Sequence, residues 1–165
     1  GSEMCIRDSL PPMKNGRIHE TDAANLKQLG EFIENTFKYN LVGEAGITTI
    51  PPLDCQEKEP TVLRTDDYET YFMNEEGTNK LMIKLNWVEK KKLNYLVLKE
   101  AIPFSQRVEK FKVCYEENGS MKECYNGTTI GYKKIIDLKG IQTDCLAIVI
   151  EDSRVAPVMS FVGVY

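Results

Sequence analysis

The sequence predicts a mainly β protein, an antiparallel β-sandwich preceded by a single amphipathic α-helix. Three observations carry this prediction. Apolar residues recur at three- and four-residue steps in one stretch only, residues 22–38, which is the spacing of one helix face. From residue 81 onward they alternate with polar residues, as in half-buried strands. Asn118-Gly119 and Asn126-Gly127 are hairpin signals, and without a second helix for crossovers the strands must be antiparallel.

The helix is predicted over residues 22–38. Thr21 or Asp22 can accept hydrogen bonds from the free amides of its first turn. Its apolar stripe must lie against other apolar surface, so either the helix packs on the sandwich or its original partner lies outside this chain. The stripe consists of Leu26, Leu29, Phe32, Ile33 and Phe37.

Residues 41–79 are rich in glycine, proline and acidic side chains. We expect a linker there that contributes a first strand at 47–50 and then runs in loops. The sandwich strands follow, turning back about every 10–14 residues, a spacing that favours a sandwich or barrel over a parallel sheet. The expected strands are 81–85, 95–98, 111–115, 121–125, 129–137, 145–151 and 157–165.

The chain divides into three parts by composition. Residues 1–9 begin with Gly-Ser, lack the apolar segment of a secretion signal, and are interpreted as a tag or cloning artefact. Residues 10–40 hold the helix, and residues 41–165 form the sandwich. With 165 residues in all, the chain has room for one buried core and an appendage.

Charge and hydropathy argue against several classes of partner. With 21 basic against 25 acidic side chains and a pI near 5.2, the chain lacks the positive field that gathers phosphates, so we expect no nucleic acid. Its apolar runs are far shorter than the roughly 20 residues that cross a bilayer, so we expect no membrane partner. The five cysteines form no C-x-x-C pair and His19 has no thiol near it in sequence, so we expect no zinc site and no cofactor.

Cys114 and Cys124 flank the Asn118-Gly119 turn, and the loop length decides whether they face each other. A two-residue turn pairs Cys114 with Glu123, whereas a three-residue turn with a bulge pairs Cys114 with Cys124. We expect free thiols, because an odd number of cysteines at scattered positions does not make a disulfide framework.

The sequence offers no catalytic constellation. Asp66-Asp67, Glu75-Glu76 and Glu116-Glu117 are adjacent pairs, and neighbours on a strand point to opposite faces, so they are interpreted as solvated charge rather than as a hydrolytic site. The sequence contains no Gly-x-Ser-x-Gly elbow and no phosphate loop. We therefore expect no catalysis by this chain alone and assign no catalytic residue.

Charged residues interrupt the apolar strands near their ends. Arg107 or Arg154, with Glu100 or Asp152, could form planar bidentate pairs. Such pairs would brace the loops that carry them, and this is the interpretation that we favour.

The same polar groups could instead hydrogen-bond sugar hydroxyls. Tyr132 or Trp87 would then offer a ring face to the apolar side of a pyranose, although Trp87 could equally be a core or rim aromatic. The candidate carbohydrate-binding residues are Trp87, Glu100, Gln106, Arg107, Tyr132 and Arg154.

Short motifs along the chain share their order with a known family. They are Leu10-Pro11-Pro12, Ile18-His19-Glu20, Leu29-Gly30-Glu31-Phe32, Thr70-Tyr71-Phe72, Gln106-Arg107-Val108, the run from Gly127 to Lys133, and Asp152-Ser153-Arg154 with Pro157, Ser160, Gly163 and Tyr165. Together they resemble bacterial α-L-fucosidases of glycoside hydrolase family 29. The similarity covers about Leu10 to Tyr165, and its first part is similar to the end of the catalytic barrel and its last helix.

The resemblance implies that the chain is the C-terminal part of a longer enzyme. In that family a (β/α) barrel carries an aspartate nucleophile and a separate acid/base, and the released fucose retains its configuration. All barrel strands would lie upstream, so no catalytic residue carries over to this chain. The resemblance also implies a jelly-roll sandwich similar to discoidin-like, galactose-binding domains, some of which bind carbohydrate and a structural calcium, and a periplasmic or secreted parent.

Three departures from the related sequences bear on calcium. Glu69 and Phe72 replace the aspartate and the tryptophan of the family's aspartate-Thr-Tyr-Trp signature. Phe161 stands where related modules often place a calcium-ligating glutamate, and a phenyl ring supplies no oxygen ligand. We expect no metal, with a calcium site at Asp66 or Asp67 as the weaker alternative.

Two roles for the sandwich follow from the resemblance. It would bind a fucosylated or galactosylated glycan near the catalytic barrel, or it would pack on that barrel and stabilise it. The alternative is an independent discoidin-like module for glycan or protein adhesion.

Overall fold

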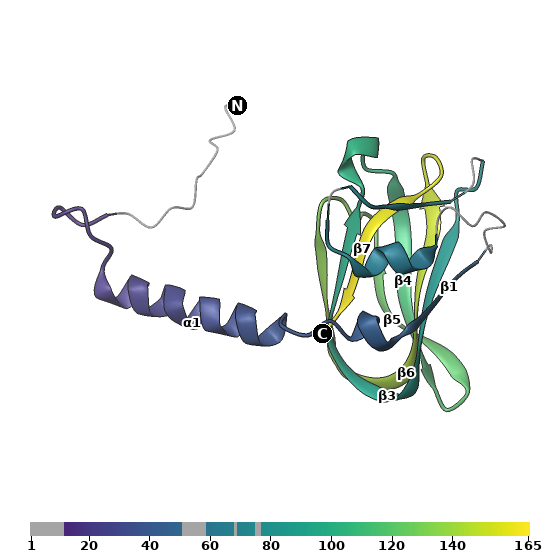
Figure 1. Cartoon of the computed structure of the whole chain (residues 1–165), viewed down its shortest axis with the longest axis horizontal. Helices are drawn as coiled ribbons and strands as arrows, with labels where there is room; N and C mark the ends of the chain where they lie inside the picture. Colours follow the sequence, from purple (N-terminus) through teal and green to yellow (C-terminus); the bar gives the residue numbers. More distant parts are fainter. Residues whose placement is uncertain (1–11, 51–58, 68, 75–76) are drawn as a thin grey trace. The chain divides into compact units, whose positions relative to one another are not determined.

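The computed structural model describes residues 12–50, 59–67, 69–74 and 77–165 (Figure 1). A helical unit ends at Tyr39 and a β unit begins at Asn40. The predicted architecture, an antiparallel β-sandwich preceded by one amphipathic helix, is confirmed. No helix in the described residues has the length and apolar character needed to span a bilayer.

Helix α1 (Glu20–Thr36) begins two residues before the predicted start, with a different cap from the one expected. The N-cap is His19, whose Nδ1 accepts a hydrogen bond from the backbone N–H of Thr21 at 3.2 Å. A ring nitrogen that accepts can take the place of the usual hydroxyl or carboxylate oxygen. The lone histidine therefore has a structural partner that the sequence did not reveal.

The apolar stripe of α1 is exposed in this structure. The exposed fractions are 45% for Leu26, 53% for Leu29, 53% for Phe32 and 47% for Ile33, and no residue of the helix is buried. The opposite face carries charged residues such as Lys27 and Glu31, which lie four residues apart and form an ion pair with an N–O distance of 3.9 Å. The stripe is present as predicted, and no residue of the helical unit covers it.

The described residues of the β unit form seven strands, and each pairing between them is antiparallel. The order across the ladder is β2, β7, β3, β6, β4, β5, with β1 also paired to β3. The strands are β1 (Gly46–Ile50), β2 (Phe72–Met73), β3 (Leu81–Glu100), β4 (Val108–Glu117), β5 (Ser120–Gly127), β6 (Lys134–Ser153) and β7 (Val158–Val164). Three short 3-10 helices join them: η1 (Leu41–Glu44), η2 (Pro60–Arg64) and η3 (Ile102–Phe104).

Two long strands, β3 and β6, belong to both layers of the sandwich and curve around one end of it (Figure 1). In one layer the first part of β3 lies between β1 and the last part of β6, which continues to β4 and β5. In the other layer the last part of β3 lies between β7 and the first part of β6. The register of β3 against β6 shifts between Asn86 and Lys91 and again between Leu93 and Tyr95, where the strands bend.

The predicted division into short strands was wrong at these two places. The predicted strands 81–85 and 95–98 are parts of one strand, and so are the last four residues of 129–137 and all of 145–151, whereas 129–133 are not in a strand. Lys91 and Lys92, which lie between the two predicted strands, pair with Thr143 and Gln142 of β6. Side chains on the outer side of such a bend contact water, so polar residues can occupy a strand there without ending it.

The hairpin between β4 and β5 shows which residue lies opposite Cys114. Glu117 pairs with Ser120 across a two-residue turn, and Cys114 pairs with Glu123 as the shorter-loop alternative predicted. Asn118 and Gly119 both have positive φ, 53° and 78°, as such a turn requires. Cys114, Cys124 and Cys145 are free thiols, as expected; Cys5 and Cys55 lie outside the described residues.

Asn40 links the start of the β unit to the end of its last strand, β7. Its side-chain Oδ1 accepts hydrogen bonds from Val42 N at 3.1 Å and from Val164 N at 3.0 Å, so one amide caps η1 and holds the end of β7. Leu63 of η2 is fully buried in the core. The main core residues come from facing positions of both layers, among them Phe72, Leu85, Leu96, Phe111, Leu146 and Val162.

Candidate functional site

The loops that carry the predicted binding residues meet at one end of the sandwich. The N–H of Glu100 donates to Gly131 O at 2.9 Å, which ties the end of β3 to the loop before β6. The N–H of Arg154 donates to Arg107 O, also at 2.9 Å, which ties the loop after β6 to the loop before β4. The sequence was therefore right to group these three segments.

Glu100 is the centre of this loop cluster. It is 2% exposed, and its Oε1 accepts hydrogen bonds from the backbone N–H groups of Arg107 at 2.7 Å and Val108 at 2.9 Å. Its Oε2 accepts from Gly131 N at 2.6 Å. A buried carboxylate that receives three backbone donors has its charge well compensated. Glu100 therefore braces two loops, and its oxygens are not presented to solvent.

The two arginines do not form the predicted forks with Glu100 or Asp152. The guanidinium of Arg107 donates to backbone carbonyls, from Nε to Phe104 O at 2.9 Å and from one terminal nitrogen to Ala156 O at 2.7 Å. Arg154 Nε pairs instead with Glu109 Oε1 at 2.7 Å on the surface. The sequence suggested carboxylate partners, but backbone carbonyl groups of the turning loops lie closer to the Arg107 guanidinium.

The two aromatic candidates lie in opposite environments. Trp87 is 6% exposed, packs in the core, and donates from Nε1 to Leu41 O at 2.9 Å. Of the two alternatives for Trp87, a sugar-stacking ring or a core aromatic, the structure supports the core aromatic. Its ring presents no face to solvent. Tyr132 is 57% exposed and lies beside the loop cluster, where Gln106 is also exposed. Of the predicted candidates, Tyr132 keeps an accessible ring.

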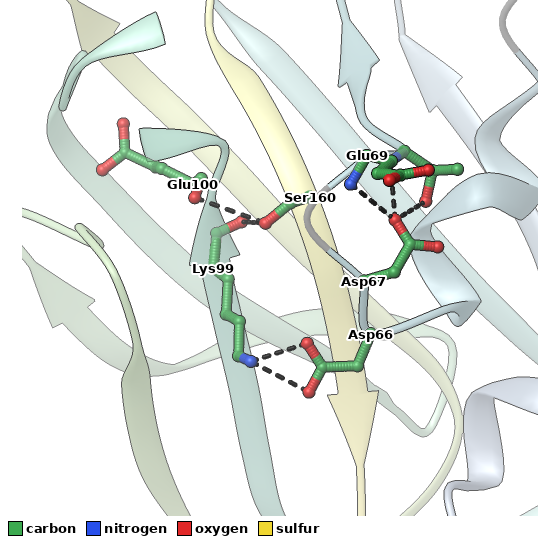
Figure 2. A network of polar contacts seen from close by, with 7 residues as sticks. Asp66, Asp67, Glu69, Lys99, Glu100 and Ser160 are labelled. Carbon is green, nitrogen blue, oxygen red and sulfur yellow. Dashed lines mark hydrogen bonds and ion pairs between the residues drawn. The ribbon is translucent and has the colours of Figure 1, made fainter. Parts of the chain in front are cut away.

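Next to this cluster lies a small pocket whose centre is Lys99, a residue that the sequence did not single out. Its Nζ donates to both carboxylate oxygens of Asp66, at 2.6 and 2.9 Å (Figure 2). The same ammonium lies 5.8 Å from the ring centroid of Tyr132 and 5.6 Å from that of Phe161, within the range of cation–π attraction. The side chain of Lys99 is 11% exposed and that of Asp66 is 50% exposed.

The pocket is too small to enclose a sugar ring. Its volume is about 20 Å³, enough for about one water molecule. Ile102, Pro103 and Ser160 complete its wall, and the Ser160 hydroxyl lies near the carbonyls of Lys99 and Glu100, at 3.4 and 3.3 Å (Figure 2). A ligand here would lie on the rim and insert one small group.

The sequence could not have found Lys99 and Asp66 as a pair. Strand alternation places Lys99 on the outer face of β3, where a lysine normally reaches water. Its carboxylate partner comes 33 residues earlier, from a loop without regular structure. The only available signal was the charged pair Lys99-Glu100 inside an otherwise apolar run from Leu96 to Ile102.

Asp67 has a local structural role. Its Oδ1 accepts hydrogen bonds from Thr70 N at 2.6 Å, Thr70 Oγ1 at 2.8 Å and Glu69 N at 2.9 Å (Figure 2). These donors, the backbone N–H of Thr70 first among them, hold the pKa of Asp67 below its ordinary value. The carboxylate thus fixes the backbone of Glu69 and Thr70 beside it.

The pair Asp66 and Asp67 does not fit a calcium site in this arrangement. An ammonium already occupies both oxygens of Asp66, and one oxygen of Asp67 is taken by three donors. Calcium prefers six to eight oxygen ligands. Within the described residues, no group of three or more acidic, histidine or cysteine side chains is placed to hold a metal ion.

Comparison with known proteins adds what the geometry alone does not give. No protein-family model matches the chain. It is 27% identical over 160 residues to a rice (Oryza sativa subsp. japonica) protein named as an α-L-fucosidase, covering 95% of this chain and 31% of that protein. A solved structure from Bacteroides thetaiotaomicron, described as an α-L-fucosidase, superposes with a TM-score of 0.87 at 25% identity, over 94% of this chain and 35% of that one.

The chain matches the C-terminal region of α-L-fucosidases. It spans about a third of the length of these relatives. The fold is not confined to fucosidases, because a chitosan-binding module of a chitosanase/glucanase from Paenibacillus sp. IK-5 superposes with a TM-score of 0.66 at 13% identity. That module is matched over 98% of its length and 77% of this chain, so a sandwich of this size exists as a unit of its own.

Proposed function

We propose that this chain is the non-catalytic C-terminal part of an α-L-fucosidase, in which α1 packs its apolar stripe on the catalytic domain and the sandwich stabilises that domain. The parent would hydrolyse α-L-fucosides with retention of configuration and would be periplasmic or secreted. The observation that carries the docking role is the exposed stripe of α1, centred on Leu29 and Phe32. The relatives have about two thirds of their length outside the matched region, which supplies a partner for it.

The stripe is too apolar to be left in water without cost. Four large side chains that are each about half exposed lie on one face of a helix, and burying such surface contributes roughly 25 cal/mol per Å². A helix of this length is also only marginally stable without packing. Both arguments favour a partner surface for α1.

The first test is the coding sequence upstream of this region. A fucosidase catalytic domain there would support the proposal, and an unrelated domain would overturn it.

The second test uses the full-length enzyme with Leu29→Ser and Phe32→Ser combined. The expected result is a melting temperature lower by on the order of 5 °C, with fucosidase activity per folded molecule unchanged. The matched control is Lys27→Ser with Glu31→Ser, two substitutions on the charged face of the same helix, which should leave melting unchanged. Equal melting of the two double variants would contradict docking through the stripe.

The isolated chain separates docking from a fold-back of the helix on its own sandwich. If the stripe serves a missing domain, light scattering should show self-association that Leu29→Ser with Phe32→Ser reduces. A monomer whose sandwich is destabilised by the same double variant would instead assign the stripe to the sandwich.

Carbohydrate binding is a second candidate role. Support comes from the likeness of the fold to the Paenibacillus module, which is named for binding chitosan. An independent adhesion module remains the alternative, and the upstream coding sequence distinguishes it from an enzyme domain.

A further inference from the structure

We infer that the pocket formed by Lys99, Asp66 and Tyr132 is a binding site for one residue of a neutral sugar. The inference deepens the carbohydrate-binding candidate and does not depend on the docking of α1. It also moves the site away from Trp87, Glu100 and Arg107, whose hydrogen-bonding groups and ring face are already engaged within the fold.

The charge of the pocket selects the class of ligand. Lys99 and Asp66 form a pair with N–O distances of 2.6 and 2.9 Å, so their charges neutralise each other. The other two carboxylates that line the pocket, those of Asp67 and Glu100, already accept hydrogen bonds from backbone N–H groups. An anion would meet the carboxylate of Asp66, and a cation would meet the ammonium of Lys99. A hydroxyl group both donates and accepts, so two adjacent hydroxyls of a neutral pyranose can donate to Asp66 and accept from Lys99 together.

The position of the pair makes it accessible for this purpose. Half of the Asp66 side chain is exposed, and each of its oxygens keeps acceptor capacity beside the hydrogen bond from Lys99, so a hydroxyl donor from outside can still bind. Lys99 is held almost immobile under the rings of Tyr132 and Phe161, so little side-chain entropy is lost when it accepts a further partner. The site is thus preorganised by contacts that exist without ligand.

The shape of the site agrees with a sugar that lies on the surface. The pocket has room for about one water molecule, and a single hydroxyl can take that place. The exposed ring of Tyr132, at the rim, would then contact the C–H face of the pyranose. A site with one ring and one ion pair predicts weak binding, with Kd on the order of 1 mM.

The experiment is a titration of the isotope-labelled chain, followed by amide NMR, with methyl α-L-fucoside, methyl β-D-galactoside and N-acetylglucosamine. Glucuronate and glucosamine serve as charged probes. At least one neutral sugar should shift the amides of residues 66–67, 99–102 and 131–133, and the charged sugars should bind more weakly. Asp66→Asn and Tyr132→Ala should each weaken binding at least tenfold.

Matched controls keep the result interpretable. Glu117→Gln neutralises a surface carboxylate that pairs with Lys122, outside the pocket, and should leave sugar binding unchanged. Asp66→Asn is isosteric and Tyr132 is exposed, so the dispersion of the amide spectrum will show that both variants fold.

Each outcome decides one proposal. Binding that survives Asp66→Asn and Tyr132→Ala, that shifts amides elsewhere, or that favours a charged sugar would overturn this site and leave the carbohydrate-binding candidate standing. No shift with any sugar up to on the order of 50 mM would overturn both. Neither result touches the docking of α1, which is read from melting and light scattering.

Discussion

Helix α1 and strand β7 both carry a strong apolar signal, yet their surroundings are opposite. All seven residues of β7 are buried, whereas none of the 17 residues of α1 is buried. Strand β7 lies between β2 and β3 in its layer, so hydrogen bonds fix its neighbours on both sides. The apolar stripe of α1 indicates that the helix needs a partner but does not identify one.

The comparison teaches that apolar pattern and burial are separate pieces of information. On β7, Met159 and Val162 belong to the core, while Phe161 lies outside the core cluster and is nevertheless 4% exposed, with the Lys99 ammonium 5.6 Å from the centroid of its ring. Phe161 is therefore buried by residues that are distant from it in the sequence. The sandwich supplies its own cover, whereas the helical unit by itself does not cover the stripe of α1.

The largest expected effect comes from removing the carboxylate that braces the sandwich loops. Glu100→Ala should lower the free energy of unfolding of the β unit by on the order of 4 kcal/mol, because three backbone donors lose their acceptor. Urea denaturation followed by near-ultraviolet circular dichroism measures this. Glu109→Ala, which breaks the exposed pair with Arg154, is the control and should cost about 0–1 kcal/mol. Equal losses for both variants would mean that Glu100 is not a brace.

A smaller effect is expected where β7 leaves no room for a side chain. A Cβ added at Gly163 would lie 2.7 Å from Phe161 Cε1 and 2.8 Å from Tyr165 Cε2, so both rings would have to move. Gly163→Ala should cost about 2 kcal/mol by the same measurement. At Gly43 an added Cβ meets nothing within 4 Å, so Gly43→Ala is the matched control and should be close to neutral. If Gly163→Ala were as stable as Gly43→Ala, β7 would be less tightly packed than its burial indicates.

The smallest effect concerns acid stability on the outer face of β6. Hydrogen bonds from Lys112 and then Lys110 lower the pKa of Glu151 from its ordinary value of 4.5 to about 2. Because the folded pKa is depressed, the stabilisation is complete above about pH 4.5 and is lost as the pH falls toward about 2.

Glu151→Gln should therefore flatten the pH dependence of unfolding in that window, and urea titrations at several pH values will show it. Lys112→Gln should flatten it partly, since its hydrogen bond is the largest cause of the shift. A slope in Glu151→Gln equal to that of the unchanged chain would refute this origin of the acid sensitivity.

Much of the fold could be predicted from the sequence, because period and turn chemistry are local. The stripe from Leu26 to Ile33 identified the helix, and Asn118-Gly119 identified the hairpin but left its turn open between two and three residues. The continuity of β3 and β6 could not be predicted. It depends on pairing between residues such as Lys91 and Thr143, which are far apart in the sequence.

The candidate site was predictable only in part. Loops 100–107 and 131–133 do meet, because β3 and β6, the strands that carry them, pair with each other. The roles of Glu100 and Arg107 were not predictable, since their partners are backbone groups whose positions depend on the fold. The pair of Lys99 and Asp66 joins a strand to an irregular loop, a contact that leaves no periodic trace in the sequence.

The position of β7 has a consequence for synthesis. Residues 158–164 are made after every other strand of the sandwich, yet they lie in the interior of their layer, between β2 and β3. While the chain emerges from the ribosome, the late part of β3 therefore presents an unpaired edge until those seven residues arrive. A pause in translation shortly before codon 158 would prolong that exposure and raise the risk of aggregation, without any change to the finished protein.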